Sequence, residues 1–223
     1  MVRASEKLRF AVLAVDVVYF RIIDNKLSLL LGKVTTAPDF IGKWALIGGL
    51  IAPDETADDA VKRHLKVKAG IEVPYTEQLY TFSAINRDRR GRVISVAYVA
   101  LANSNLQNKQ KAETETKWCP IAGIPSLAYD HDEIVRVAID RLRSKFTYTT
   151  MAQFLLPEEF TLSELQKTYE IVMGKEMDKR NFRKKILSLG IIAITKKVKI
   201  GKANRPAALY RFKKRSPLFI DIL

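Results

Sequence analysis

The segment from Gly49 to Ile71 contains residue types that could hold a divalent metal, and others that oppose one. Glu55 supplies carboxylate oxygens, which are the ligands that Mg²⁺ prefers, and a bound metal would polarise phosphates and activate water. His64, Val67 and Lys68 follow on the same segment. Val67 offers no ligand, and a positive charge ~4 Å from the metal site costs about 4 kcal/mol per unit-charge pair at an effective dielectric of ~20. We therefore expect no metal site and no catalytic residue here.

The remaining potentially reactive side chains favour structural roles. Asp58 and Asp59 fall in the first turn of an expected helix, where acidic groups favour the helix dipole. His64 has no second His or Cys nearby in sequence, and His131 lies among acidic residues that we expect to cap a helix. Cys119, the single cysteine, has no identifiable base partner and is expected to be a buried, inert thiol.

Basic residues are concentrated toward the C-terminus. The chain of 223 residues has a formal net charge of +14. Residues 151–223 contain 16 Lys and Arg but only 7 Asp and Glu, and residues 179–215 contain 14 basic residues and no acid. Such an acid-free stretch indicates a polyanion partner, with nucleic acid as the first candidate.

Composition excludes several other classes of protein. The chain is 48% hydrophobic, too apolar for intrinsic disorder. Its longest apolar runs, such as Phe10 to Val15, are far shorter than the ~20 residues that span a bilayer, and no signal peptide is visible. A soluble cytoplasmic protein without a membrane partner is therefore expected.

The first part of the chain mixes strands and helices. Strands are expected at Phe10–Ile23, Leu27–Leu31, Gln78–Ile85 and Arg92–Ala102, and a loop at Asn103–Lys117. Thr56 can cap a helix that runs to Ala69, with Gly70 as its left-handed terminator. Apolar spacing predicts a second helix over 132–146. This mixture predicts a sandwich of the α/β or α+β class, and we assign the chain to α+β.

The second part has a different character, so we place a boundary after residue 150, with domains at 1–150 and 151–223. Thr161 and Glu164 have capping-box spacing, and Asp178 can cap the next helix. Strands are expected at Ile191–Thr195 and Ala208–Phe212, joined by a basic loop over 196–206. Helix, turn, cationic helix and basic hairpin together predict a winged helix-turn-helix.

This unit is expected to bind double-stranded DNA. Arg180 and Arg183 should share an outward face with Lys184, and arginine suits bidentate contact with guanine. Lys184, Lys197 and Lys199 should mainly touch phosphates. The full set of expected DNA-binding residues is Lys179, Arg180, Asn181, Arg183, Lys184, Lys196, Lys197, Lys199, Lys202 and Arg205.

The segment at 49–71 resembles the Nudix box, G-x5-E-x7-R-E-U-x-E-E-x-G-U with U apolar. Gly49, Glu55, Arg63, Gly70 and Ile71 match it, whereas three of its glutamates are replaced by the residues discussed above. A degenerate Nudix domain before a basic winged helix resembles the NrtR-type repressors, also at 87–98, 129–134, 178–185 and 210–212. The resemblance implies a Nudix α/β/α sandwich, a homodimeric bacterial repressor and an effector such as ADP-ribose or a related NAD metabolite.

The effector is expected to bind the first domain through cations that meet a diphosphate and an aromatic ring that stacks on a base. The expected contacts are Lys33, Lys43, Trp44, Lys68, Arg87 and Arg90. No metal and no cofactor is expected. Three alternatives stay open: a Nudix hydrolase with a nonstandard metal site, a nucleic-acid adaptor without a ligand, and a regulator that senses a sugar such as arabinose.

Overall fold

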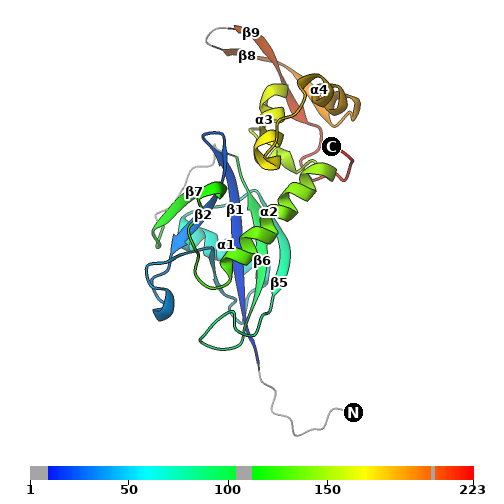
Figure 1. The fold of residues 1–223 in the computed structure, drawn as a ribbon. Coiled ribbons are helices and arrows are strands. Elements are labelled where there is room, and N and C mark those ends of the chain that lie inside the picture. The colour runs from blue at the N-terminus through cyan, green and yellow to red at the C-terminus, as the bar shows by residue number, and fades with distance from the viewer. Residues whose placement is uncertain (1–9, 104–111, 202–203) are drawn as a thin grey trace, which may run out of the picture.

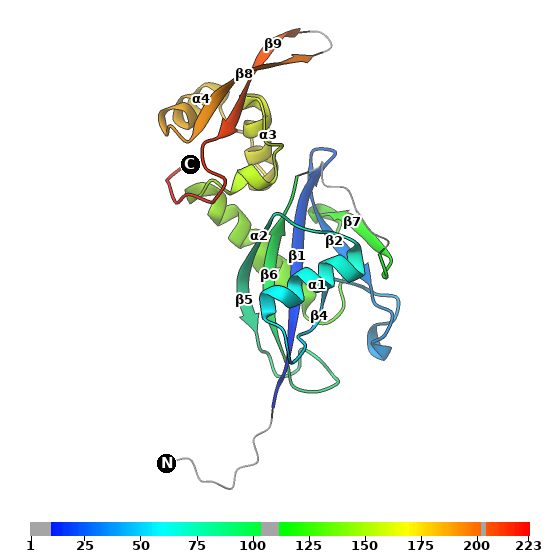
Figure 2. The ribbon, with the colours of Figure 1, turned by 180° about the vertical axis from the view of Figure 1, so that it is seen from behind.

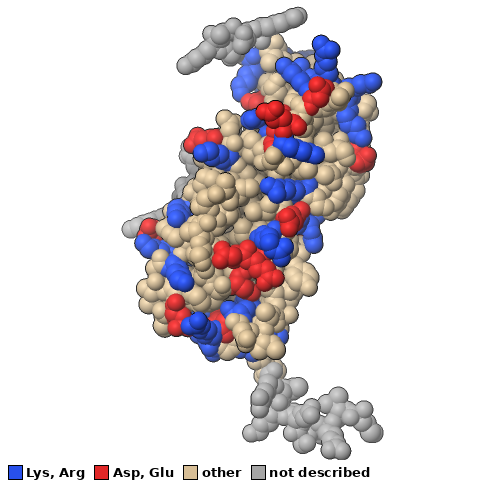
Figure 3. Space-filling view, viewed as in Figure 1, with Lys and Arg blue, Asp and Glu red and all other residues tan. Residues whose placement is uncertain are grey.

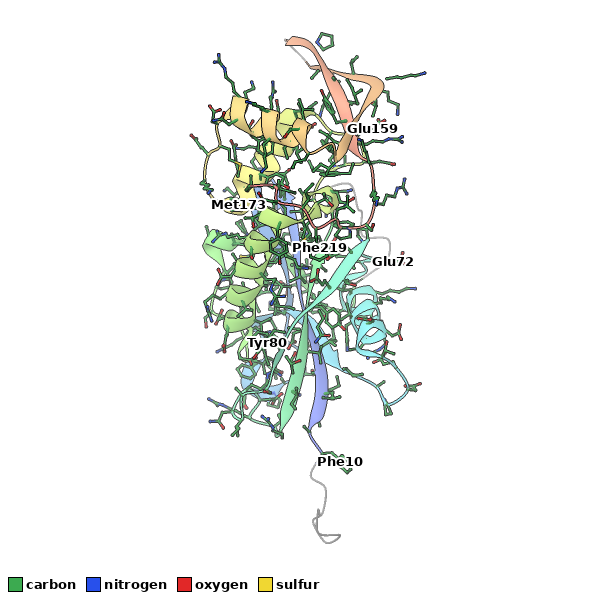
Figure 4. The ribbon with its side chains drawn as sticks, turned by 90° about the vertical axis from the view of Figure 1, so that its right-hand side faces the viewer. Phe10, Glu72, Tyr80, Glu159, Met173 and Phe219 are labelled. Atoms are coloured by element: carbon green, nitrogen blue, oxygen red, sulfur yellow. The ribbon has the colours of Figure 1, made fainter. Side chains whose placement is uncertain are left out.

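The computed structural model describes residues 10–103, 112–201 and 204–223. A central β-sheet has helices on both faces, and a smaller unit with a protruding hairpin lies at one end of it (Figure 1). Helix α1 (Ala57–Ala69) covers one face, seen in front in Figure 2, and α2 (His131–Tyr148) covers the other, as the edge-on view in Figure 4 shows. The predicted α/β/α sandwich followed by a winged helix-turn-helix is confirmed.

The sheet is organised around β1 (Val12–Ile23). The other strands are β2 (Lys26–Lys33), β3 (Trp44–Ala45), β4 (Ile47–Leu50), β5 (Tyr75–Phe82), β6 (Val93–Leu101) and β7 (Thr116–Pro120). Strand β1 pairs in parallel with β6 and antiparallel with β2 and β4. Its middle is a continuous buried run because helices cover both faces. Asp24 and Asn25, with φ of 48° and 57°, make the two-residue turn into β2.

Helix α1 begins and ends at the residues that the sequence predicts. The Thr56 hydroxyl accepts a hydrogen bond from the Asp59 amide, and Gly70 ends the helix in the left-handed conformation with φ of 67°. The apolar stripe of α1, including Val61 and Leu65, packs against β1. Burial of this stripe supplies most of the stability of such a helix.

Helix α2 extends beyond the predicted range by one residue at its start and two at its end. Its apolar face packs on the opposite side of the sheet, and the same hydrophobic core continues into the C-terminal unit. Within the described residues, three short 3-10 helices complete the connections: η1 (Pro38–Phe40), η2 (Ile121–Gly123) and η3 (Met151–Phe154). The hydrophobic core includes residues on both sides of residue 150, so the domain boundary at that residue stays a prediction.

The C-terminal unit consists of α3 (Leu162–Met173), α4 (Lys179–Ser188), β8 (Ile192–Gly201) and β9 (Asn204–Phe212). Thr161 and Glu164 form the predicted capping box, and the Asp178 carboxylate caps α4 by accepting from the Asn181 amide at 2.8 Å. Phe182 and Ile186 are buried against the rest of the unit, so the opposite face of α4 is left to solvent.

Two predicted loops are partly wrong. Most of the basic segment from Lys196 to Pro206 extends β8 and β9, because the hairpin pairs as far as Gly201 and Asn204, with register shifts along it. The segment Asn103–Lys117 runs into β7 at Thr116, while residues 104–111 lie outside the described part of the chain. Among the described residues, no helix has the length and apolarity that crossing a bilayer requires.

Candidate functional site

A cleft of about 480 Å³ opens beside the N-terminal end of α2. Strands β1, β2 and β4, helix α1, the connection between β5 and β6, and the residues before α2 all line it. The lining residues that carry charge or an aromatic or imidazole ring are Asp16, Lys33, His64, Lys68, Arg87, Asp88, Arg90, Glu113, Tyr129 and His131. Cations and rings therefore meet at one cavity, although they come from distant parts of the chain.

Two glycines on β4 allow strand β1 and the His64 ring of α1 to pack closely against this strand. A Cβ on Gly48 would lie 2.1 Å from the Val15 carbonyl oxygen, and one on Gly49 would lie 2.5 Å from the His64 ring. Gly49 thus has a packing reason to match the Nudix pattern here, because only hydrogen leaves room for the imidazole.

The floor of the cleft is a buried ionic network centred on Asp16. Its carboxylate accepts from the Ser95 hydroxyl at 2.6 Å and from Arg87 Nη2 at 3.1 Å, and His131 Nε2 lies 3.2 Å away. Arg87 also donates to both oxygens of Asp130, at 2.7 and 2.9 Å. Burial alone would raise the pKa of Asp16, but His131, Ser95 and Arg87 hold it well below its usual range. Asp16 is therefore a charged anchor at neutral pH.

Residues of the segment that resembles the Nudix box make contacts within the protein. Glu55 is paired with Arg63, which is the first cause that lowers the pKa of Glu55 to about 2. His64 Nε2 lies 3.0 Å from the Leu50 carbonyl oxygen. Lys68 Nζ donates to the Gly48 carbonyl at 2.5 Å, and burial lowers its pKa. No group of three or more His, Cys, Asp or Glu in the described residues could hold a metal ion.

Four of the six predicted effector contacts line the cleft: Lys33, Lys68, Arg87 and Arg90. Lys33 pairs with Glu115 at 2.8 Å, and Arg90 pairs with Asp88 at 2.7 Å. Arg87 is buried in the ionic network. Lys68 differs from these three because its hydrogen-bond acceptor is a neutral carbonyl, so its charge is not neutralised by that contact.

Lys43 and Trp44 do not belong to the residues that line the cleft. Lys43 Nζ lies over the Phe40 ring, 5.6 Å from its centroid. The Trp44 ring faces Lys33 and Lys117, with Nζ–centroid distances of 5.7 and 4.1 Å. The structure therefore places these two residues outside the cavity that the other four predicted contacts line.

The aromatic side of the cleft was not predicted. Tyr129 lines it with a φ of 56°, its ring is 4.4 Å from that of Phe40, and Arg90 lies 5.8 Å above it. Tyr129 thus contributes a phenol ring to the lining of the cleft. For the buried ionic network, by contrast, the sequence did carry a signal. Asp16 is a lone acid inside an apolar strand, and such an acid must find buried partners.

Two structural expectations are settled by the geometry. The predicted capping role at 129–133 is wrong, because the Asp130 side chain binds Arg87 instead of the helix end. His131 is buried, and its Nδ1 accepts from the Leu46 amide at 2.9 Å. Cys119 is buried as expected, with its Sγ 3.2 Å from the Gly123 carbonyl oxygen.

The second candidate surface is the exposed face of α4, where Lys179, Arg180, Asn181 and Lys184 are open to solvent. Basic side chains gather along this end of the molecule (Figure 3). The predicted outward direction of Arg183 is wrong. Its side chain lies against α3, Nη2 donates to the Ser163 hydroxyl at 3.1 Å, and Nε is buried. On this ten-residue helix, Arg183 lies between the buried side, with Phe182, and the exposed side, with Lys184.

The hairpin supplies further cations on β8. Lys196, Lys197 and Lys199 are exposed. Lys197 pairs with Glu159 at 3.0 Å and Lys199 with Glu164 at 2.5 Å, so α3 and the segment before it hold the hairpin; Figure 4 labels Glu159 at its base. Arg205 belongs to β9, although its side chain is not described, and Lys202 lies outside the described residues.

Fold and surfaces together define a class of protein, a Nudix-type domain joined to a winged helix with a basic recognition helix. Residues 12–141 match the NUDIX domain family, and residues 152–212 match the NrtR DNA-binding winged helix domain. This is the architecture of the Nudix-related transcriptional regulators.

The chain belongs to the NrtR family within that class. It is 35% identical over 205 residues to the ADPR responsive transcriptional repressor NtrR of Acinetobacter baylyi, covering 90% of this chain and 81% of that protein. It is similar to Shewanella oneidensis NrtR in complex with a 27mer DNA, with a TM-score of 0.80, 35% identity and coverage of 90% and 93%. The NUDIX domain of the same Shewanella protein, complexed with ADP ribose, matches with a TM-score of 0.55 and 35% identity, covering 60% of this chain and 90% of that one.

Proposed function

We propose that this protein is a transcriptional repressor that binds duplex DNA through α4 and the β8–β9 hairpin, and that ADP-ribose or a related metabolite in the cleft controls its DNA affinity. The observation that carries the proposal is the similarity across both domains to a NrtR protein in complex with DNA. The basic, solvent-facing side of α4 and the cationic cleft supply the chemistry that these two ligands need.

On DNA, α4 would enter the major groove with its N-terminal residues toward base edges. Arg180 is the candidate for bidentate contact with guanine because it is exposed near the start of α4. Lys184, Lys196, Lys197 and Lys199 would neutralise phosphates. Since winged-helix repressors commonly act as dimers, we propose a homodimer on an inverted repeat with half-sites about 10–10.5 bp apart, or a multiple of that.

Two substitutions test this surface. Arg180→Ala should cost ~1–3 kcal/mol on the operator and relax preference at one base pair, whereas Lys197→Ala should weaken all duplexes alike and reduce the salt slope by about one. Lys62→Ala on α1 is the control, because it removes one positive charge from an exposed position that is far in sequence from α4 and the hairpin. Operator and scrambled duplexes are titrated over a salt series. Equal losses on both duplexes for Arg180→Ala would reduce the unit to a generic polyanion binder.

In the cleft, Lys68 would meet the diphosphate. Its ammonium has three donors, and the Gly48 carbonyl uses one of them. Lys33 can turn toward the ligand at low cost because its pair with Glu115 is exposed, and such pairs contribute only ~0–1 kcal/mol. Arg90 would meet the ligand while it stays paired with the buried Asp88 carboxylate. Tyr129 would stack on the planar part of the ligand.

ADP-ribose at 100 times its Kd should stabilise the protein by ~2.7 kcal/mol and change operator affinity. Lys68→Met should weaken ADP-ribose binding, while Lys43→Met, outside the cleft lining, is the matched control. A response to pentoses with none to ADP-ribose would support the sugar-sensing alternative, and no response to any of them would support an adaptor without a ligand.

We also propose that the protein regulates without hydrolysing its effector. Lys68 occupies a position where the Nudix pattern has a glutamate, and its charge opposes Mg²⁺ binding. Incubation with ADP-ribose and Mg²⁺ or Mn²⁺ should release no product. Metal-dependent turnover near ~1 s⁻¹ would instead establish a hydrolase with a nonstandard site.

A further inference from the structure

Helix α2 connects the cleft to the winged helix. It has 18 residues, so at 1.5 Å per residue its axis is about 27 Å long. Its first residue, His131, lines the cleft, and its last turns pack on α3. Both ribbon views show it running from the sheet domain toward the C-terminal unit (Figures 1 and 2).

The start of α2 is held by groups that a ligand would meet. Arg87 lines the cleft and bridges Asp16 on β1 to Asp130, the residue that precedes the helix. The Leu46 amide, before β4, donates to His131 Nδ1. Arg87 has five N–H donors, and three of its contacts in this structure go to the two carboxylates. A ligand anion that attracts Arg87 or His131 would therefore change the contacts that orient the first turn of α2.

The far end of α2 is tied to the helix-turn-helix in two ways. Arg143 Nε donates to the Val172 carbonyl in the last turn of α3 at 3.1 Å. The Phe146 ring meets Tyr169 of α3 edge to face at 5.2 Å, and Tyr169 in turn contacts Phe182 of α4 at 5.4 Å. These three rings are buried, so movement of α2 is passed on by packing to the recognition helix.

We propose that α2 is the coupling element of this regulator, with Arg87 and Asp130 as positioning residues at the cleft and Arg143 and Phe146 as positioning residues at the winged helix. The inference rests on the proposed function. The effector would favour one position of α2, and the operator another, so that the two ligands influence each other through this helix. Coupling of this kind requires each ligand to prefer one of two arrangements.

The test uses the protein with both of its domains and variants of α2 residues that do not line the cleft and do not belong to the proposed DNA-binding surface. Operator Kd is measured with and without saturating ADP-ribose for wild type, Arg143→Ala and Arg141→Ala. Arg141 is the matched control because it lies on the same helix, is half-buried like Arg143, and has no hydrogen bond to α3 among the described residues. Wild-type coupling is expected at ~5- to 150-fold.

Arg143→Ala should keep the ADP-ribose Kd and the effector-free operator Kd within about twofold while coupling falls at least about threefold. By reciprocity, the operator's effect on ADP-ribose affinity should fall by the same factor. Phe146→Leu should act in the same direction, which gives a second variant if Arg143→Ala folds poorly. Arg141→Ala should couple like wild type.

Full coupling in both Arg143→Ala and Phe146→Leu would overturn the role of α2 and leave the proposed function intact. Equal loss of coupling in Arg141→Ala would also overturn it, since the effect would then not depend on the contact with α3. A wild-type protein that binds neither ADP-ribose nor DNA would overturn the proposed function itself, and this inference with it.

Discussion

Asp16→Asn is expected to destabilise the protein by about 3 kcal/mol at pH 7. Asp16 is 6% exposed and Arg87 is 7% exposed, so the pair is shielded from water. Removing one partner of a buried ion pair costs about 3–5 kcal/mol. The lower end applies here because Arg87 keeps both of its hydrogen bonds to Asp130. For a protein of this size the change corresponds to a drop in Tm of roughly 6–12 °C.

The pH dependence of this loss identifies its cause. The pKa of Asp16 lies well below its usual range in the folded protein, so the unfolded state binds the proton more readily. The stabilisation is therefore fully present above the unfolded pKa of about 4 and is lost as pH falls toward the folded value. The difference between wild type and Asp16→Asn should be constant from pH 7 to 5 and shrink below pH 4.

Urea denaturation of both proteins at several pH values measures this difference. Asp140→Asn is the control: Asp140 is an exposed acid whose pair with Arg136 spans 3.8 Å, and its loss should cost at most ~0.5 kcal/mol. A cost below ~0.5 kcal/mol for Asp16→Asn at pH 7 would refute the buried network as a source of stability. A difference that is unchanged from pH 7 to pH 3 would refute the ionised carboxylate as its cause.

Three further substitutions test local features, each by urea denaturation of the variant. Thr161→Ala removes the capping box with Glu164 and should cost ~1 kcal/mol; no change would mean that the cap does not stabilise α3. Gly49→Ala places a methyl group 2.5 Å from the His64 ring and should cost about 1–3 kcal/mol, and less in a His64→Ala background; an equal cost there would exclude the ring as its cause. Tyr169→Phe should leave stability unchanged or raise it by up to ~1 kcal/mol, because the buried hydroxyl has no hydrogen-bond partner in the described part of the structure, and a loss above ~1 kcal/mol would reveal one.

The starts of α1, α3 and α4 were predictable because their signals are local. Thr56, Thr161 and Asp178 each cap a helix as the sequence indicates, since a side-chain oxygen needs only a backbone amide three residues away. The Nudix-like spacing was equally readable, and so were the replaced glutamates. The hairpin strands were predicted too short, because pairing with the opposite strand overrides the weak strand preference of a Lys-rich segment.

Other features were decided only by the tertiary structure. Arg87 and Asp16 are 71 residues apart in sequence, and Arg87 and Asp130 are 43 apart, so nothing local predicts their buried network. Lys43 and Trp44, which were selected for their chemistry, lie outside the cleft lining, whereas Tyr129 comes to the cleft through a left-handed turn before α2. Arg183 likewise turns to α3, because Ser163, 20 residues earlier, lies within hydrogen-bond reach.

The sequence by itself determined the residue types: a cationic, carboxylate-poor box and a basic recognition helix with its caps. These follow from composition and from spacing within one helical turn or one motif. Only the tertiary structure decided which cations line the cleft and which of them form ion pairs within the protein. It also decided that one helix connects the cleft to the DNA-binding unit. The physical reason is that burial and charge pairing depend on distances through space between residues that chain order leaves far apart.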